Sequence, residues 1–184
     1  KMKNNYICSY SRTPIGAFQG NLSTISATNL GAATIASTIE KSGINKNYVE
    51  EVIMGNVLSA NLGQAPARQA ALGAGLLNNV ECMTINKVCG SGLKAVMLAD
   101  QSIKTGNADL IIAGGMESMS LAPHYMPKSR MGNFFGHSQL IDSILQDGLW
   151  DPYNNLAMGS CAEKLCSEKK YTREMQDQYA IESY

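Results

Sequence analysis

The fold of this chain is decided by the stretch Met83-Thr84-Ile85-Asn86-Lys87-Val88-Cys89-Gly90-Ser91-Gly92-Leu93-Lys94-Ala95. An apolar, β-branched run ends at a cysteine, and a helix-like sequence follows two glycines around a serine. This order predicts a strand, a sharp turn and a helix, with Cys89 at the helix N-terminus. A thiol there meets unpaired backbone N–H groups and the positive end of the helix dipole, which favour the reactive thiolate. The alternative is a buried structural cysteine, because free cysteine is among the most buried residue types.

Strand-like and helix-like segments alternate on both sides of this stretch. Ser23 or Thr24 is the expected N-cap of the first helix, and Gly43 is its expected end. Unbroken apolar strands separated by helices are typical of a parallel sheet that is covered on both faces. The sequence therefore predicts an α/β fold. The expected strands are residues 6–10, 51–58, 83–88 and 109–113, and the expected helices are residues 24–41, 67–72 and 93–104.

The character of the sequence changes after about Ser120. Residues 121–155 carry prolines, glycines and scattered aromatic side chains, which indicate a loop-rich insertion or a second subdomain. Short helices are expected within this part at residues 139–146 and after it at residues 160–168. A last helix is expected at residues 172–184, with Thr172 as its N-cap.

Composition excludes several classes of protein. The chain has 184 residues, 45% of them hydrophobic, and it carries 15 basic and 15 acidic side chains. This balance suits a folded globular protein and argues against a nucleic-acid partner. No apolar stretch is long enough to span a bilayer, and residues 1–6 show no signal peptide. We expect a cytoplasmic protein, or a mitochondrial one if a transit peptide has been removed.

The cysteines indicate a reducing compartment, because their number is odd and their spacing irregular. They are Cys8, Cys82, Cys89, Cys161 and Cys166. Cys161 and Cys166 could form half of a metal site. The only histidines are His124 and His137, and no second ligand pair completes a tetrahedral set. The sequence therefore predicts no metal.

Six segments resemble the motifs of the thiolase family, most closely its biosynthetic branch, in the family's order and spacing. They are residues 12–18, 55–58, 63–70, 86–94, 114–120 and 157–163. The resemblance implies the first half of a five-layered αβαβα thiolase fold, with the start of an inserted loop domain. Residues 1–120 would be the N-terminal half, a mixed sheet with helices, and residues 121–184 the incomplete loop domain. The C-terminal half, with a catalytic histidine and a second cysteine, would lie outside this chain.

The resemblance implies that Cys89 is the nucleophile of an acetyl-CoA C-acetyltransferase. Two acetyl-CoA would condense to acetoacetyl-CoA and CoA, or the reverse, through an acetyl-cysteine. Coenzyme A is part of the substrate, and no separate cofactor is expected. Met158 would border the acetyl group and Leu149 would touch the CoA, with ordinary core packing as the alternative for both. Residues 1–184 alone are expected to be inactive.

Two other functions stay open at this point. Ala157 stands where biosynthetic members often carry histidine, which leaves a degradative 3-ketoacyl-CoA thiolase possible. A non-catalytic acyl-CoA or lipid-binding protein of the same fold is the alternative from another class. Residues 126–135 fall where the family places its assembly loop, so a homodimer or homotetramer is expected. Glu117 and Arg68 lie in matching segments and are interpreted as structural.

Overall fold

The computed structural model of the protein describes residues 4–184 and divides into two units after Ser143. Lys1–Lys3 lie outside the described residues. They belong to the segment in which the sequence shows no signal peptide. Residues 121–143 belong to the first unit, although the composition changes after Ser120. The boundary of an inserted loop domain at residue 121 stays a proposal.

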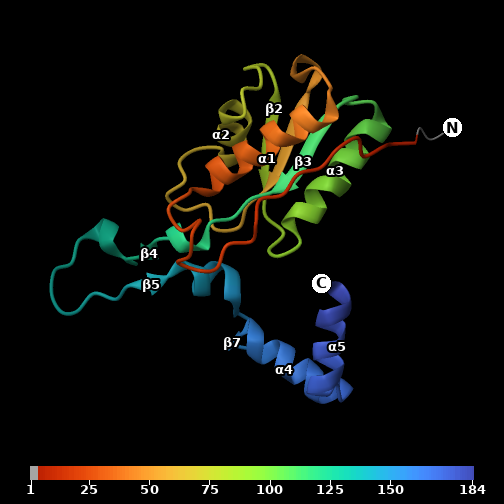
Figure 1. Cartoon of the computed structure of the whole chain (residues 1–184). Helices are drawn as coiled ribbons and strands as arrows, with labels where there is room; N and C mark the ends of the chain where they lie inside the picture. The colour runs from red at the N-terminus through yellow and green to blue at the C-terminus, as the bar shows by residue number, and fades with distance from the viewer. Residues whose placement is uncertain (1–3) are drawn as a thin grey trace. The chain divides into compact units, whose positions relative to one another are not determined.

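Three parallel strands form the sheet of the first unit, and β1 (Glu51–Gly55) lies between β2 (Glu81–Ile85) and β3 (Ile111–Gly115) (Figure 1). The register pairs Gly55 with Ile85 on one side and with Gly115 on the other. The carboxyl ends of all three strands therefore reach the same edge of the sheet. Every residue of β1 is buried, as expected for the central strand of a covered sheet.

Helices cover both faces of this sheet. α1 (Ala27–Ser42) and α2 (Pro66–Gly73) lie on one face and α3 (Ser91–Thr105) on the other (Figure 1). Side chains alternate along β1, so Val52 and Met54 pack with α1 and α2 while Ile53 packs with α3. The predicted parallel sheet with helices on both faces is confirmed. A single three-residue hydrogen-bonded turn, η1 (Lys46–Tyr48), separates α1 from β1.

One end of the first helix is where the sequence predicts it, and the other is not. Gly43 ends α1 in the left-handed conformation, with φ at 66°, which confirms that prediction. The N-cap is Ser26 rather than Ser23 or Thr24, because the Ser26 side chain accepts a hydrogen bond from the Asn29 N–H at 3.2 Å. Residues 21–24 instead form turns ahead of the helix.

The expected strand at residues 6–10 is wrong. These residues are irregular, and Tyr6, Ile7 and Tyr10 are exposed. A strand forms only where another strand supplies hydrogen-bond partners, and no described strand pairs with this segment. The segment is instead fixed through Asn5, whose side-chain amide donates to the backbone and side chain of Asp100 on α3 at 3.0 and 2.9 Å.

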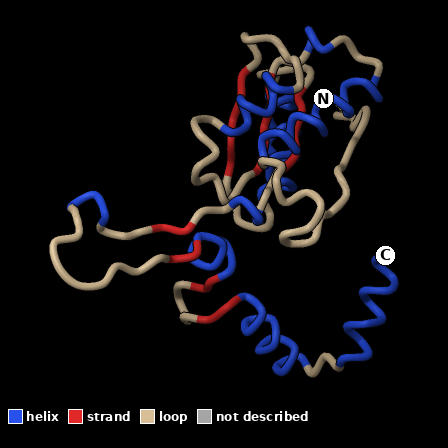
Figure 2. The backbone as a smooth tube through the Cα atoms, turned by 60° about the vertical axis from the view of Figure 1, so that its left-hand side comes forward, coloured by secondary structure: helices blue, strands red, loops and turns tan. Residues whose placement is uncertain are grey.

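A two-stranded antiparallel ladder follows the sheet, formed by β4 (His124–Tyr125) and β5 (Ile141–Asp142). Figure 2 shows these strands at the base of a long loop. Short 3₁₀ turns, η2 (Met119–Leu121) and η3 (Ser129–Met131), lie before β4 and within the loop. The expected helix at residues 139–146 is therefore wrong at its start, because pairing with β4 holds residues 141–142 extended.

The second unit begins with the π-helical turn η4 (Ile144–Leu149). The strands β6 (Trp150–Asp151) and β7 (Leu156–Ala157) pair antiparallel. Two helices follow, α4 (Met158–Lys169) and α5 (Arg173–Ser183), both near their expected positions. Thr172 caps α5 as predicted, since its hydroxyl accepts from the Met175 N–H at 3.3 Å.

The two faces of α3 differ in the size of their side chains. Ala95 and Ala99 pack against the sheet and are buried. Leu93, Val96 and Met97 point away from it, and Leu93 is 70% exposed. Three bulky apolar side chains of this helix therefore lie on its outer side, whereas the inner side combines the small residues Ala95 and Ala99 with Leu98.

We predict that Gly55→Ala destabilises the complete protein by about 1–3 kcal/mol, because overpacking forces backbone shifts of that cost. A Cβ at Gly55 would lie 2.6 Å from Ser91 Cβ and 2.7 Å from the Ser91 carbonyl carbon. Urea unfolding measures the change in the free energy of unfolding. Gly114→Ala is the matched control, because its nearest neighbour would be Met54 Sδ at 3.6 Å, an ordinary contact. Equal losses in both variants would contradict the argument.

Candidate active site

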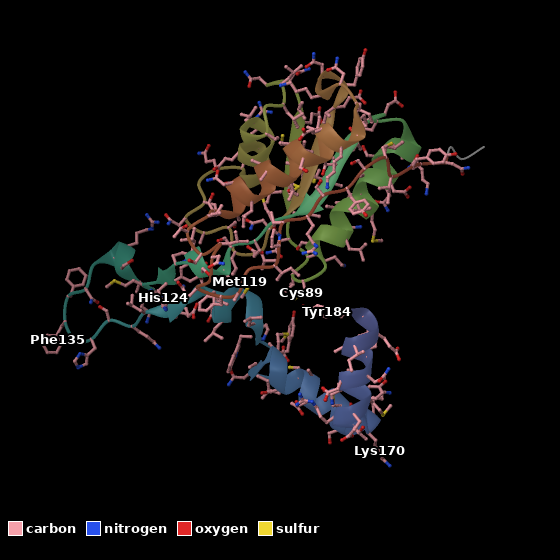
Figure 3. All side chains as sticks on the ribbon, viewed as in Figure 1. Cys89, Met119, His124, Phe135, Lys170 and Tyr184 are labelled. Atoms are coloured by element: carbon pink, nitrogen blue, oxygen red, sulfur yellow. The ribbon has the colours of Figure 1, made fainter. Side chains whose placement is uncertain are left out.

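Cys89 lies on the turn between β2 and α3, close to one end of the helix (Figure 3). β2 ends at Ile85 and α3 begins at Ser91, with Gly90 as its N-cap. The predicted sequence of strand, sharp turn and helix is thus confirmed. The Cys89 side chain is exposed in this chain, so it is not a core cysteine of the first unit. The thiol is open to a ligand from outside the sheet.

Hydrogen bonds close the turn beneath Cys89. The Ser91 hydroxyl accepts from the Lys87 N–H at 2.8 Å and donates to the Val88 carbonyl at 2.6 Å. The Asn86 side-chain oxygen accepts from the Val88 N–H at 2.8 Å. The sequence singled out Cys89 but not these two polar partners. The signal that could have found Asn86 is the ability of Asn to accept from a backbone N–H two residues on.

Glycines let the start of α3 approach the sheet edge closely. Gly92 faces Gly115 at the end of β3, where a Cβ on Gly115 would lie 3.3 Å from Gly92 Cα. Gly55 at the end of β1 lies against Ser91 in the same way. Backbone therefore packs directly on backbone at these two strand ends. The position of Cys89 relative to the sheet follows from this packing, since α3 begins two residues after it.

Glu117 ties together the loops that follow β1 and β3. Its carboxylate accepts from the Asn56 side chain at 2.8 Å and from the N–H groups of Val57 at 2.9 Å and Leu58 at 3.0 Å. Burial raises the pKa of the Glu117 carboxyl, and the two backbone N–H bonds oppose that rise. The structural interpretation of Glu117 is confirmed, because its contacts are to the chain's own backbone and to Asn56.

Arg68 also has a structural role. Its guanidinium donates to the Val80 carbonyl at 2.6 Å and to the Asn78 carbonyl at 2.5 Å, which anchors the loop ahead of β2. The neighbouring Cys82 thiol has a raised pKa because it is partly buried, and Arg68 partly offsets that rise. Arg68 and Cys82 therefore belong to the framework of the sheet and not to the turn that carries Cys89.

Leu149 and Met158 adjoin the β6–β7 ladder of the second unit. Leu149 directly precedes β6 and Met158 directly follows β7, and the register pairs Trp150 with Ala157. The ladder ends at that pair, because Leu149 belongs to η4 and Met158 to α4. The substrate contacts that the sequence proposes for these two residues stay a prediction. Cys89 belongs to the other unit.

The side chains of residues 4–184 form no metal-binding cluster. Within that range, no three His, Cys, Asp or Glu side chains lie close enough together to hold a metal ion. No helix of the same range is long and apolar enough to cross a membrane. His124 lies in β4 and pairs with Asp142, and His137 is exposed in the loop that follows.

A family model described as the thiolase N-terminal domain matches residues 5–184, which include both units and the Cys89 turn. The chain belongs to the thiolase family. The expected fold class is thereby confirmed as that of a thiolase N-terminal half. A solved structure supports it, the Acat5 thiolase from Ascaris suum in complex with coenzyme A. It has a TM-score of 0.90 and 44% sequence identity, and the match covers 97% of this chain and 46% of that one.

Curated relatives named acetyl-CoA acetyltransferase are similar over almost the whole chain. Acetyl-CoA acetyltransferase 2 of Arabidopsis thaliana is 57% identical over 179 residues, which are 97% of this chain and 44% of the relative. Acetyl-CoA acetyltransferase of Saccharomyces cerevisiae is 54% identical over 185 residues, which cover 99% of this chain and 46% of the relative. The chain thus spans about half the length of the curated relatives it matches.

We predict that Glu117 makes stability fall as pH rises. Its raised pKa means that the folded state keeps this proton to higher pH than the unfolded state does. The free energy of unfolding should therefore decrease from pH 4.5, the ordinary glutamate value, through the raised pKa. Urea unfolding at a series of pH values measures this slope. In Glu117→Gln this part of the slope should vanish, because an amide does not titrate; an unchanged slope would contradict the assignment.

Proposed function

We propose that the complete protein is an acetyl-CoA C-acetyltransferase, which condenses two acetyl-CoA to acetoacetyl-CoA and CoA and catalyses the reverse thiolysis. The observation that carries the proposal is the exposed Cys89 thiol on a strand-to-helix turn, in a chain 57% identical to an acetyl-CoA acetyltransferase. Acetyl-CoA and acetoacetyl-CoA are the proposed substrates. Coenzyme A enters as part of the substrate, and we propose no separate cofactor.

In the first half-reaction, the Cys89 sulfur attacks the carbonyl carbon of acetyl-CoA. A new carbon–sulfur bond forms, the bond to the CoA sulfur breaks, and CoA leaves with the proton that Cys89 gives up. Exchange of one thioester for another is nearly balanced in energy, so the step runs in both directions. We assign the backbone N–H of Cys89, ahead of the first turn of α3, to stabilising the negative oxygen that develops.

In the second half-reaction, a second acetyl-CoA loses a proton from its methyl carbon. The resulting carbanion attacks the acetyl group on Cys89, a carbon–carbon bond forms, and the Cys89 sulfur leaves and is protonated. The base for these steps is assigned to the C-terminal half, as the resemblance to thiolases implies. The two histidines of this chain, His124 and His137, lie in and after β4, away from any family base motif.

We assign substrate contacts to Met158 and Leu149, with Met158 next to the acetyl group and Leu149 against the CoA. Both adjoin the paired residues Trp150 and Ala157, which supports their lying in the same part of the second unit. Relatives at 50–57% identity carry the name acetyl-CoA acetyltransferase, so the comparisons do not favour the degradative thiolase or the non-catalytic binder.

The exposed stripe of Leu93, Val96 and Met97 supports a second half that covers α3 in the complete protein. Contiguous apolar side chains of this kind are rarely left in water. We propose that covering completes the five layers of the fold. We propose that the protein is located in the cytoplasm, or in mitochondria after removal of a transit peptide. Fractionation of cells would test this location. One relative, from Aspergillus fumigatus, has the word mitochondrial in its name.

We predict that acetyl-CoA labels Cys89 and none of the other four cysteines. Incubation of the complete protein with acetyl-CoA, followed by peptide mass spectrometry, locates the acetyl group. Cys89→Ala should lower kcat by about 10⁴-fold or more, the scale seen when a nucleophile is removed. Cys8→Ala is the control, since Cys8 is exposed in the irregular N-terminal segment and should leave turnover unchanged. An acetyl group on another cysteine, with Cys89 unmodified, would contradict the assignment of Cys89 as the nucleophile.

We predict a homodimer or homotetramer for the complete protein. The loop of residues 126–135 supports assembly, because Phe134 and Phe135 are almost fully exposed. Phe135 is labelled in Figure 3. Light scattering should give at least twice the monomer mass, and Phe134→Asp with Phe135→Asp should shift a tetramer towards dimers. A stable monomer at micromolar concentration would contradict the prediction.

A further inference from the structure

Val88, the residue before Cys89, has an unusual backbone conformation. Its φ is 48°, in the left-handed region that β-branched residues rarely adopt. A residue held there is strained, and it persists only where its surroundings fix it. Five residues, from Asn86 to Gly90, connect β2 to α3, so this strain lies directly beside the proposed nucleophile.

Burial of the Val88 side chain does not fix this conformation, because the residue is 49% exposed. The bonds that do reach it are polar. Ser91 Oγ donates to the Val88 carbonyl at 2.6 Å, and Asn86 Oδ1 accepts from the Val88 N–H at 2.8 Å. Side chains from the two ends of the turn thus bond both polar groups of the strained residue, and the Ser91 backbone N–H also donates to the Val88 carbonyl at 3.1 Å.

Ser91 holds a second group as well. Its hydroxyl accepts from the Lys87 N–H at 2.8 Å, so one oxygen connects the residues on both sides of the Lys87–Val88 peptide bond. Ser91 itself is 4% exposed and packs against Gly55 at the end of β1. The hydroxyl is thus anchored to the sheet, and through it the turn is anchored too.

We propose that Ser91 and Asn86 are positioning residues for Cys89: together they hold Val88 in the left-handed region and so fix where the thiol lies. The importance of that position for acetyl transfer rests on the proposed function. Without the two side chains, Val88 relaxes towards an ordinary backbone conformation and the following residue is displaced. Reaction between two held groups is sensitive to such shifts, whereas attack by a freely diffusing reagent is much less so.

The experiment compares two reactions of Cys89 in the complete protein. In Ser91→Ala, the limiting rate of acetyl transfer from acetyl-CoA to Cys89 should fall by about 10- to 100-fold, as a misplacement near 1 Å does. The acetyl-CoA concentration at half-maximal rate should stay unchanged, because no substrate contact is removed. Alkylation of Cys89 by iodoacetamide, a small reagent that needs no fixed approach, should change far less than acetyl transfer does.

Ser102→Ala is the matched control. Ser102 lies on the same helix, far along it, and its hydroxyl donates to Glu51 Oε2 at 3.0 Å. The substitution therefore removes a comparable hydrogen bond from α3 without touching the Cys89 turn, and it should leave both rates as they are. A loss of rate equal to that in Ser91→Ala would show that any weakening of α3 is enough, and would overturn the proposal.

A rescue separates positioning from general stability. Glycine adopts positive φ without strain, so adding Val88→Gly to Ser91→Ala should restore most of the acetyl transfer rate. Asn86→Ala supplies a second test if Ser91→Ala does not fold, because Asn86 is exposed and its loss spares the core. It should slow acetyl transfer in the same direction. Failure of the rescue, or an unchanged rate in Asn86→Ala, would overturn the proposal.

The two proposals fail in different ways. If acetyl-CoA labels a cysteine other than Cys89 in the unsubstituted protein, the proposed function is wrong. If Cys89 is labelled but Ser91→Ala reacts at the full rate, the proposed function stands and the positioning role is wrong. Peptide mass spectrometry of the same samples distinguishes these results.

Discussion

The first turn of α3 packs directly against the backbone of two strand ends, and the rest of the site depends on that contact. Gly55 and Gly115 end neighbouring strands at the same level, and neither carries a side chain that would keep the helix away. A Cβ at Gly55 would overlap Ser91, so the distance from sheet to helix is set by main-chain atoms. The turn that carries Cys89 starts from one strand end and finishes at this contact. Its shape is therefore fixed at both ends by the parallel sheet.

In the loops that follow the strand ends, side chains supply the hydrogen-bond partners of the backbone. Ser91 and Asn86 close the turn after β2, and Glu117 joins the loops after β1 and β3. These loops lie outside the strand ladders, so their N–H and C=O groups need other partners. Each of the three side chains supplies such partners. Polar residues near the candidate site thus shape loops, and Cys89 is left as the exposed reactive group among them.

Prediction from the sequence succeeded where the signal is local. Apolar runs and helix periodicity located β1, α2 and α3, and the Cys89 segment indicated the strand-to-helix turn from its residue types alone. Prediction failed where a distant segment determines the local structure. Residues 6–10 have strand-like side chains, but no described strand pairs with them. Residues 141–142 are extended because β4 pairs with them. The roles of Asn86 and Ser91 depend on the positive φ of Val88, and a backbone angle is not visible in the order of residue types.

The unequal faces of α3 have a thermodynamic consequence for the thiol at its start. On the inner face, Ala95 and Ala99 have little apolar surface to bury and Leu98 packs beside them, whereas Leu93 and Met97 on the outer face are still 70% and 50% exposed. Covering of the outer face would therefore add hydrophobic stabilisation that the helix does not obtain from its own sheet. Local opening of α3 is easiest while the outer face is bare and becomes rarer once it is covered. A partner that covers the outer face would in this way also order the turn that carries Cys89, which directly precedes the helix.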